Sequence, residues 1–434
     1  MNVTSSYAIE ILNKNRKTFQ PTIDVYRSAI SYIIDVCETE WHTISSLTPK
    51  LQQYSFVEHL IHNTKNNKAK YEFDTKFHKM PVYLMRSAIH KAIGSVSSYH
   101  ANYQNWIDNG QKGKAPRLNP DTHDMPVFYH EQMYKPGKIK LFLNNDWVWI
   151  DIDFKKTDVN YLRKYWSHTK ASAPKLEKRY GKYFLRFSFE EKDIKLTDTP
   201  VQDQIICAVD LGLNTDATCS IMNSTGTVLA RKFINFPNEK DQLYHVLNRI
   251  KKKQRQYGPK NPKGLWQYAS RLNNELAKKI AKVITEFAYV NHTDTIVFEH
   301  LDFQGKKKGS KKQRLHYWKK NSIQKLVEHK AHRLGVRISR ICARNTSRLA
   351  FDGSGIVTRD ENNYSLCTFR TGKQYNCDLN ASYNIGARYF IRELLKPLPV
   401  KARSLFEAKV PFAKRRISCT LNTLLQLNVQ MRLS

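Results

Sequence analysis

The segment CAVDLGLN, residues 207–214, continues a run of apolar β-formers that starts at Ile205 and stops at Asp210. Gly212 follows two residues later, so Asp210 stands where a buried strand ends and a turn begins. Because Asp-x-Gly is common in turns, one such carboxylate decides nothing by itself. It gains a functional meaning only if other carboxylates of the chain converge on the same place.

Strands and helices alternate on the C-terminal side of this segment. The strands IICAVDLGLN, ATCSIMN and VLARKFINF come first, and a long helix with an apolar stripe from Leu265 to Phe287 follows. The strand TIVFEHL, a helix that ends before Gly335, the strand VRISRI and the closing helix DLNASYNIGARYFIREL complete the series. This order predicts an RNase H-like α/β domain.

The N-terminal half changes its hydrophobic period twice. SYAIEIL alternates like a strand, and the pattern is then helical from Thr22 to about Trp106. After the breaker NGQKGKAPRLNP, the period returns to two from about Met125, in KIKLFL, DWVWIDIDF and KYFLRFSFE. We therefore expect a small β-barrel into which a helical domain is inserted.

The charge balance narrows the class of partner. The 434 residues include 72 Lys and Arg against 38 Asp and Glu, a formal net charge of +34 with a pI near 9.8. Such an excess repels itself unless a polyanion neutralises it, which indicates nucleic acid. An anionic membrane is the alternative, but it usually binds a basic amphipathic helix rather than a large charged body.

The cysteines and the apolar runs indicate a cytoplasmic protein. Seven cysteines at irregular spacing are no disulfide framework and fit a reducing compartment. No apolar run reaches the roughly 18 residues of a membrane span, and the first residues lack the pattern of a secretion signal.

Two further acidic residues stand at equivalent places. Glu299 follows the apolar strand TIVF, and Asp378 opens the closing helix. In an RNase H-like sheet these positions meet Asp210, and three carboxylates together repel one another unless cations neutralise them. Two Mg²⁺ ions roughly 3.5–4 Å apart would neutralise the carboxylates, and such a pair of ions supports the hydrolysis of phosphodiester bonds. The alternative is structural: Asp210 starts a turn, Glu299 is an edge charge, and Asp378 is a helix N-cap.

These motifs carry a resemblance to a known family. AVDLGLNTDATCSI, IVFEHLDF and DLNASYNIGARYF resemble the three RuvC motifs of TnpB, the transposon-encoded RNA-guided DNA nuclease, and of the compact type V CRISPR effectors. The resemblance implies a wedge-like barrel and a helical recognition domain that grip a guide RNA and the short DNA motif flanking the target. It also implies a RuvC domain that cuts DNA with Asp210, Glu299 and Asp378 as catalytic metal ligands.

The resemblance implies seven segments. They are the first part of the wedge barrel (1–20), the helical recognition domain (21–120), the rest of the barrel (121–203), the RuvC domain (204–341), a degenerate zinc-ribbon-like insertion (342–377), the last RuvC helix (378–395) and a basic C-terminal tail (396–434).

The sequence departs from the pattern of this family at the zinc ribbon. Family members usually carry two Cys-x-x-Cys pairs before the last Asp, but this stretch holds only Cys342, Cys367 and Cys377. Tetrahedral zinc needs four ligands, so we expect that zinc is not bound and that a β-hairpin module persists without it. The basic residues expected to guide single-stranded DNA there are Arg344, Arg348, Arg359, Arg370 and Lys373.

Two basic runs flank the acidic strand and suggest phosphate binding. An isolated run of this kind is usually a solvated loop, but beside a nuclease site in a chain of this charge it favours nucleic-acid contact. The candidates are Lys251, Lys252, Lys253, Arg255, Lys306, Lys307 and Lys308, with Trp318 as a stacking ring.

The sequence thus predicts an RNA-guided DNA endonuclease with two Mg²⁺ ions, a guide RNA and target double-stranded DNA as partners, acting as a monomer or as a homodimer on one RNA. Two alternatives stay open. One is an RNA-guided DNA-binding repressor that does not cut, and the other is an unguided, structure-specific nuclease, which would leave the first 200 residues unexplained.

Overall fold

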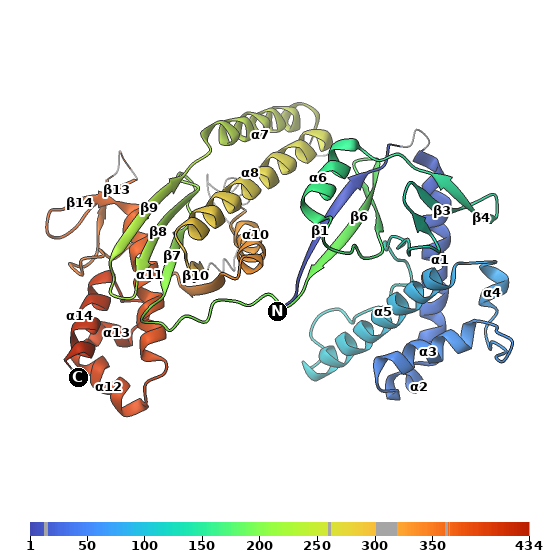
Figure 1. Ribbon diagram of the computed structural model, residues 1–434, viewed down its shortest axis with the longest axis horizontal. Helices are drawn as coiled ribbons and strands as arrows, with labels where there is room; N and C mark the ends of the chain where they lie inside the picture. Colours follow the sequence, from blue (N-terminus) through green and yellow to red (C-terminus); the bar gives the residue numbers. More distant parts are fainter. Residues whose placement is uncertain (13–15, 259–261, 301–318, 361–362, 364, 434) are drawn as a thin grey trace. The chain divides into compact units, whose positions relative to one another are not determined.

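The computed structural model describes residues 1–12, 16–258, 262–300, 319–360, 363 and 365–433. The chain divides into two compact units (Figure 1). The first unit is Asn2–Glu191, and the second is Lys192–Ser434 together with Met1.

The first unit contains two antiparallel sheets of three strands each. One sheet has the order β1-β6-β5, formed by β1 (Val3–Glu10), β6 (Lys182–Glu191) and β5 (Lys175–Arg179). The other has the order β2-β3-β4, formed by β2 (Tyr134–Lys135), β3 (Lys138–Leu143) and β4 (Asp146–Asp151). The first and last strands of the unit are neighbours, as an insertion between them requires. The closed barrel stays a prediction, because the strands hydrogen-bond as two separate sheets.

Helices fill the sequence between β1 and β2. They are α1 (Gln20–Thr39), which follows the short 3-10 helix η1 (Arg16–Phe19), α2 (Trp41–Ser46), α3 (Lys50–Ile61), α4 (Phe73–Lys76) and α5 (Val82–Asp108). The apolar stripe of α5 packs on α1, and the Tyr26 and Ser87 hydroxyls share a buried hydrogen bond of 2.9 Å. The stripe leaves the core towards its end, where Tyr103 is exposed.

Two elements of this unit were not expected from the sequence. They are α6 (Lys156–Trp166) and β5. In α6 only Trp166 is buried, and β5 reads KLEKR with only Leu176 buried. A segment that buries one side chain shows almost no hydrophobic period, so its secondary structure cannot be predicted from the hydrophobic pattern.

The second unit is built on a mixed five-stranded sheet. Its strands are β7 (Ile205–Asp210), β8 (Ala217–Asn223), β9 (Val228–Ile234), β10 (Thr295–His300) and β11 (Arg337–Cys342). The order is β11-β10-β7-β8-β9, with β8 and β9 antiparallel to their neighbours and β10 and β11 parallel to β7. This topology confirms the predicted RNase H-like fold.

Helices cover both faces of this sheet (Figure 1). On one face, α8 (Lys263–Val290) and α10 (Lys320–Arg333) pack on Cys207 and Val209. On the other face, α11 (Cys377–Leu395) packs on Ile206 and Ala208. Gly386 allows the close approach of α11, since a methyl group there would lie 3.0 Å from Met222 Sδ and 3.4 Å from Ala208 Cβ. β7 therefore has both faces buried, which explains its unbroken apolar run.

Two parts of this unit differ from the expectation. The run that begins at Lys251 belongs to a helix, α7 (Pro237–Tyr257), and not to a loop. Residues 396–434 are not an extended tail, because they contain α12 (Val400–Lys409), α13 (Pro411–Lys414) and α14 (Leu421–Arg432). Leu421, Leu424 and Leu427 of α14 are buried in the hydrophobic core that α11 forms on the sheet, and their three-residue spacing is a helical signal that was not recognised.

The insertion before α11 folds as a small antiparallel sheet. Its strands are β12 (Thr358–Arg359), β13 (Leu366–Thr368) and β14 (Gln374–Asn376). Their core is apolar and contains Ala350, Val357, Cys367, Phe369 and Cys377. Cys342 lies outside this core and is exposed.

No helix in the described part of the chain combines the length and the apolar character that crossing a membrane requires.

Candidate active site

Asp210 and Glu299 end neighbouring parallel strands. Val209 of β7 is paired with Phe298 of β10, so the next residue of each strand is an acid. Val209 and Phe298 pack towards α8 and α10. Because side chains alternate along a strand, the two carboxylates belong to the opposite face, which α11 covers.

Asp378 lies in the first turn of α11. The N-cap of this helix is Asn376, whose side-chain oxygen accepts hydrogen bonds of 3.0 Å from the backbone N–H groups of Asp378 and Leu379. The interpretation of Asp378 as the N-cap is therefore wrong. Asp378 precedes Gly386 by eight residues, about two helical turns, and so shares the helix face that packs on β7.

The electrostatics of Asp210 show that the three acids share one region. Desolvation raises the pKa of Asp210 well above its usual value, and the negative charges of Glu299 and Asp378 raise it further. Arg359 acts in the opposite direction. Neither the Asp210 nor the Asp378 carboxylate has a hydrogen bond or an ion pair to any residue that the structure describes. The carboxylates of both Asp210 and Asp378 are therefore available to bind a ligand.

Glu299 is held more tightly than the other two acids. It is 8% exposed, and one carboxylate oxygen accepts a short hydrogen bond from the Thr346 hydroxyl. Its backbone oxygen accepts a bond of 2.9 Å from Gln324 Nε2. Desolvation raises the pKa of Glu299, while the Thr346 bond and the charges of Arg388 and Lys320 oppose this rise.

Three neighbours of the site were not predicted from the sequence: Thr346, Gln324 and Arg388. Gln324 lies on α10 and Arg388 on α11, and both are buried polar residues on otherwise apolar helix faces. A buried polar side chain needs hydrogen-bond partners. A polar residue on an otherwise apolar helix face therefore indicates a polar group nearby, which the hydrophobic pattern alone does not reveal.

The chemistry of the donor set fits a hard divalent cation. Three carboxylates provide only oxygen ligands, which Mg²⁺ prefers. Within the described ranges, no three His, Cys, Asp or Glu side chains are arranged closely enough to hold a metal ion as they stand. Desolvation, together with the negative charges of Glu299 and Asp378, raises the pKa of Asp210, and a bound cation would favour its ionised form.

The residues predicted to bind nucleic acid lie in different parts of the second unit. Lys251, Lys252, Lys253 and Arg255 are exposed on α7, whereas Lys306, Lys307, Lys308 and Trp318 lie outside the described residues. Arg344, Arg348 and Arg359 are exposed, and Arg359 lies close enough to Asp210 to lower its pKa. The Arg370 side chain packs against Gly355. Of this set, the structure joins Arg359 to the acidic site.

Comparisons with known proteins agree with this architecture. Residues 4–143 match the model of the Aq_aa04 family. A TnpB-like protein of Aquifex aeolicus (strain VF5), aq_aa05, is 28% identical over 167 residues, which are 35% of this chain and 53% of that protein. The chain therefore spans about half the length of the curated relative that it matches.

A solved structure extends the likeness to most of the chain. The protein in a Cas12f1–sgRNA–target DNA complex has a TM-score of 0.52 and 14% sequence identity, covering 85% of this chain and 81% of that one. At this identity the likeness concerns the fold alone. Together these similarities confirm the predicted resemblance: the chain is similar in sequence to a TnpB-like protein and in fold to a compact type V CRISPR effector.

Proposed function

We propose that this protein is an RNA-guided DNA endonuclease that hydrolyses phosphodiester bonds at Asp210, Glu299 and Asp378. It would bind a guide RNA, recognise a short flanking DNA motif and a guide-complementary target, and cut that DNA. The relatives support this proposal, since one is TnpB-like and another is bound to a guide RNA and target DNA. The net charge of +34 supports it independently, because such a chain needs a polyanionic partner.

One observation carries the catalytic part of the proposal. Two carboxylates end adjacent parallel strands, a third opens the helix that covers the same face, and the charges of the other two add to the desolvation that raises the pKa of Asp210. A folded chain does not gather unneutralised acids without cost, so the arrangement indicates a site for cations.

The three acids would hold two Mg²⁺ ions. When bound, such ions activate a water molecule and stabilise the leaving oxygen of a phosphodiester. The chain's own residues prepare the site. Thr346 fixes the orientation of the Glu299 carboxylate, and Arg359 supplies a positive charge that attracts the phosphate of an approaching strand.

We propose that the insertion works without zinc. Its sheet is held by an apolar cluster that includes Phe369 and the buried Cys367 and Cys377. Aromatic contacts extend this cluster, with Phe351 and Tyr375 ring centroids 5.0 Å apart. Such a core gives the module a source of stability other than a metal.

Sequencing of the copurifying RNA, followed by a cleavage assay, tests the function. With Mg²⁺, that RNA and a matched DNA target, the wild type should cut, and Asp210→Ala should abolish cutting while target binding persists. Asp203→Asn, an exposed acid just before β7, is the matched control and should cut normally. If guided binding occurs but the wild type never cuts, the repressor alternative holds. Cutting of branched DNA without any RNA would instead favour the unguided nuclease.

A further inference from the structure

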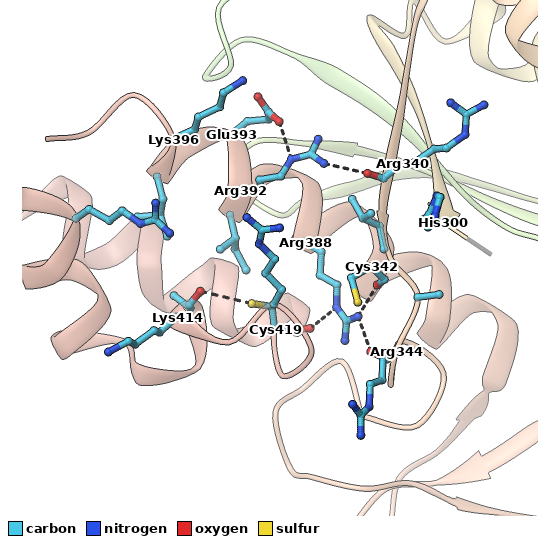
Figure 2. Close-up of a pocket in the computed structure, with 17 residues that line it drawn as sticks. His300, Arg340, Cys342, Arg344, Arg388, Arg392, Glu393, Lys396, Lys414 and Cys419 are labelled. Carbon is cyan, nitrogen blue, oxygen red and sulfur yellow. Dashed lines mark hydrogen bonds and ion pairs between the residues drawn. The ribbon is translucent and has the colours of Figure 1, made fainter. Parts of the chain in front are cut away.

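A second feature lies beside the acidic site. A cavity of about 890 Å³ opens along β11, between α11 and the C-terminal helices α12 and α13 (Figure 2). Eight of its 17 lining residues are Arg or Lys, and a single one, Glu393, is acidic. The cavity adjoins the acids at one end, because His300 in its wall directly follows Glu299, and the charge of Arg388 in its wall acts on Glu299.

Part of the wall is fixed by arginines that serve the backbone. Arg388 donates to the carbonyl oxygens of Cys342, Arg344 and Cys419 at 2.8, 2.7 and 3.1 Å (Figure 2). It also donates to that of Ile417 at 3.1 Å. Arg392 donates to the Arg340 carbonyl oxygen at 2.9 Å. β11 is an edge strand, so these bonds satisfy its outer carbonyl groups and tie the C-terminal segment to it.

The remaining cations divide into paired and unpaired groups. Arg340 is paired with Glu328, and Arg403 with Glu407, each at 2.8 Å. Arg392 holds Glu393, the acid of the wall, at 2.7 Å. The other four side chains are exposed and have no hydrogen bond or ion pair within the described part of the chain: Arg344, Lys396, Lys414 and Arg416. Four free cations around one cavity create a strong positive potential.

The shape and the apolar lining restrict the occupant. Ile341, Ile391 and Leu395 also line the cavity, so it offers apolar surface as well as charge. Its volume falls within the range of about 300–1,000 Å³ that is usual for small-ligand sites. A double helix, with a major groove alone about 12 Å wide, does not enter such a space, whereas a few nucleotides of a single strand do. The phosphodiester backbone supplies the repeated negative charge that the four cations match.

We propose that this cavity binds a segment of single-stranded nucleic acid through its phosphodiester backbone, with Lys396, the C-cap residue of α11, and Lys414 of α13 as phosphate contacts. The C-terminal helices thereby form a binding wall that adds to the RNase H-like fold. The inference rests on the nucleic-acid part of the proposed function and is independent of cleavage.

Cys342 provides a local probe. It lines the cavity and is exposed, whereas the six other cysteines are buried. The rate at which a neutral alkylating reagent modifies the metal-free full-length chain is measured with and without unstructured oligouridine or oligodeoxythymidine, and Cys342→Ser serves as the blank. Bound oligonucleotide should slow the modification several-fold.

A pair of double variants makes the test specific. Lys396→Gln with Lys414→Gln removes two cations from the cavity, and Lys401→Gln with Lys409→Gln removes two exposed cations of α12 that do not line it. The first pair should abolish the protection of Cys342 and lower the slope of log K against log salt by about 1.4, since each single-strand phosphate contact contributes about 0.7. The second pair should change neither.

Each outcome decides the proposal. Protection by oligouridine alone, by oligodeoxythymidine alone or by both assigns the site to RNA, to DNA or to the shared backbone. Absence of protection by either, or equal loss in both double variants, would overturn the inference. If guided cleavage fails but Cys342 is still protected, the proposed endonuclease is wrong and the binding site stands.

Discussion

Asp210 and Asp378 have no structural task that the described residues reveal. The cap of α11 is Asn376, and the turn after Asp210 depends on Gly212, where a methyl group would lie 2.5 Å from the Thr215 carbonyl oxygen. For Asp210, burial beside two other acids raises the free energy of the metal-free folded state in which it is ionised. This cost is measurable.

Asp210→Asn should stabilise the metal-free protein at neutral pH. Burial and the neighbouring acids raise the pKa of Asp210 in the folded state, whereas the pKa of an aspartate in the unfolded chain is about 3.9. Above that pH the unfolded chain loses its proton first, so the stability of the wild type falls as pH rises through the folded pKa. The melting temperature of the variant should exceed that of the wild type by about 2–4 °C for each kcal/mol recovered, with the gap widening above pH 4.

Magnesium should reverse this order. Under the proposed function Mg²⁺ should bind the folded wild type and raise its melting temperature, with a smaller rise for Asp210→Asn. Asp203→Asn should behave like the wild type in both conditions. A stabilisation by Asp203→Asn equal to that by Asp210→Asn would show that general charge reduction, and not the acidic site, is responsible.

Thr346→Val should weaken Mg²⁺ binding. The Thr346 hydroxyl bonds to a Glu299 oxygen and lowers the pKa of that carboxyl, so its loss leaves Glu299 less ionised and less well oriented. Removal of a partner of a metal ligand typically costs about 10–100-fold in metal affinity. The midpoint of a Mg²⁺ titration, followed by melting temperature, should rise by that factor in Thr346→Val, while Thr346→Ser keeps the hydroxyl and the midpoint. Equal shifts in the two variants would exclude the hydrogen bond as the cause.

At the scale of elements, the close contact of α11 with the sheet positions Asp378. Gly386→Val should lower the free energy of unfolding by about 1–3 kcal/mol, because its side chain would overpack against Met222 and Ala208. Gly94→Val, the same change in α5 where nothing lies within 4 Å, should alter stability by less than about 0.5 kcal/mol. Urea unfolding measures both. A similar loss in both variants would show that the close packing at Gly386 is not the cause.

The β12–β14 module, which we propose works without zinc, should depend on its apolar cluster. Phe369 is 2% exposed, and Phe369→Ala should cost about 3–5 kcal/mol and remove the hydrogen-exchange protection of β13 and β14. Phe412→Ala, at a side chain that is 61% exposed, should leave that protection intact. A chelator should have no effect on it. Loss of protection after chelation would instead show that a metal holds the module.

For the whole molecule, the net charge of +34 is the dominant property. Protein freed of nucleic acid should become more stable as salt rises, because salt screens the mutual repulsion of its cations. Melting temperatures measured across an ionic-strength series test this expectation. A melting temperature that falls with added salt would mean that favourable ion pairs outweigh the repulsion.

The elements that could be predicted are those with a strong hydrophobic period. β7, β10, α8 and α11 bury most of one or both faces, so their sequences reveal them. Three elements were not predicted because they bury few side chains: α6, α7 and β5. The leucine stripe of α14 is short and follows the basic stretch that includes Lys414, Arg415 and Arg416, and it was not predicted.

The sequence by itself determined which acids could act and which fold could carry them, because strand-ending carboxylates and apolar periods are local properties of the chain. Only the tertiary structure decided what surrounds them. The register of β7 with β10, the cap by Asn376, the Thr346 bond to Glu299 and the basic cavity beside β11 all join residues far apart in sequence. Such contacts depend on how packed elements meet in space, and no local pattern encodes them.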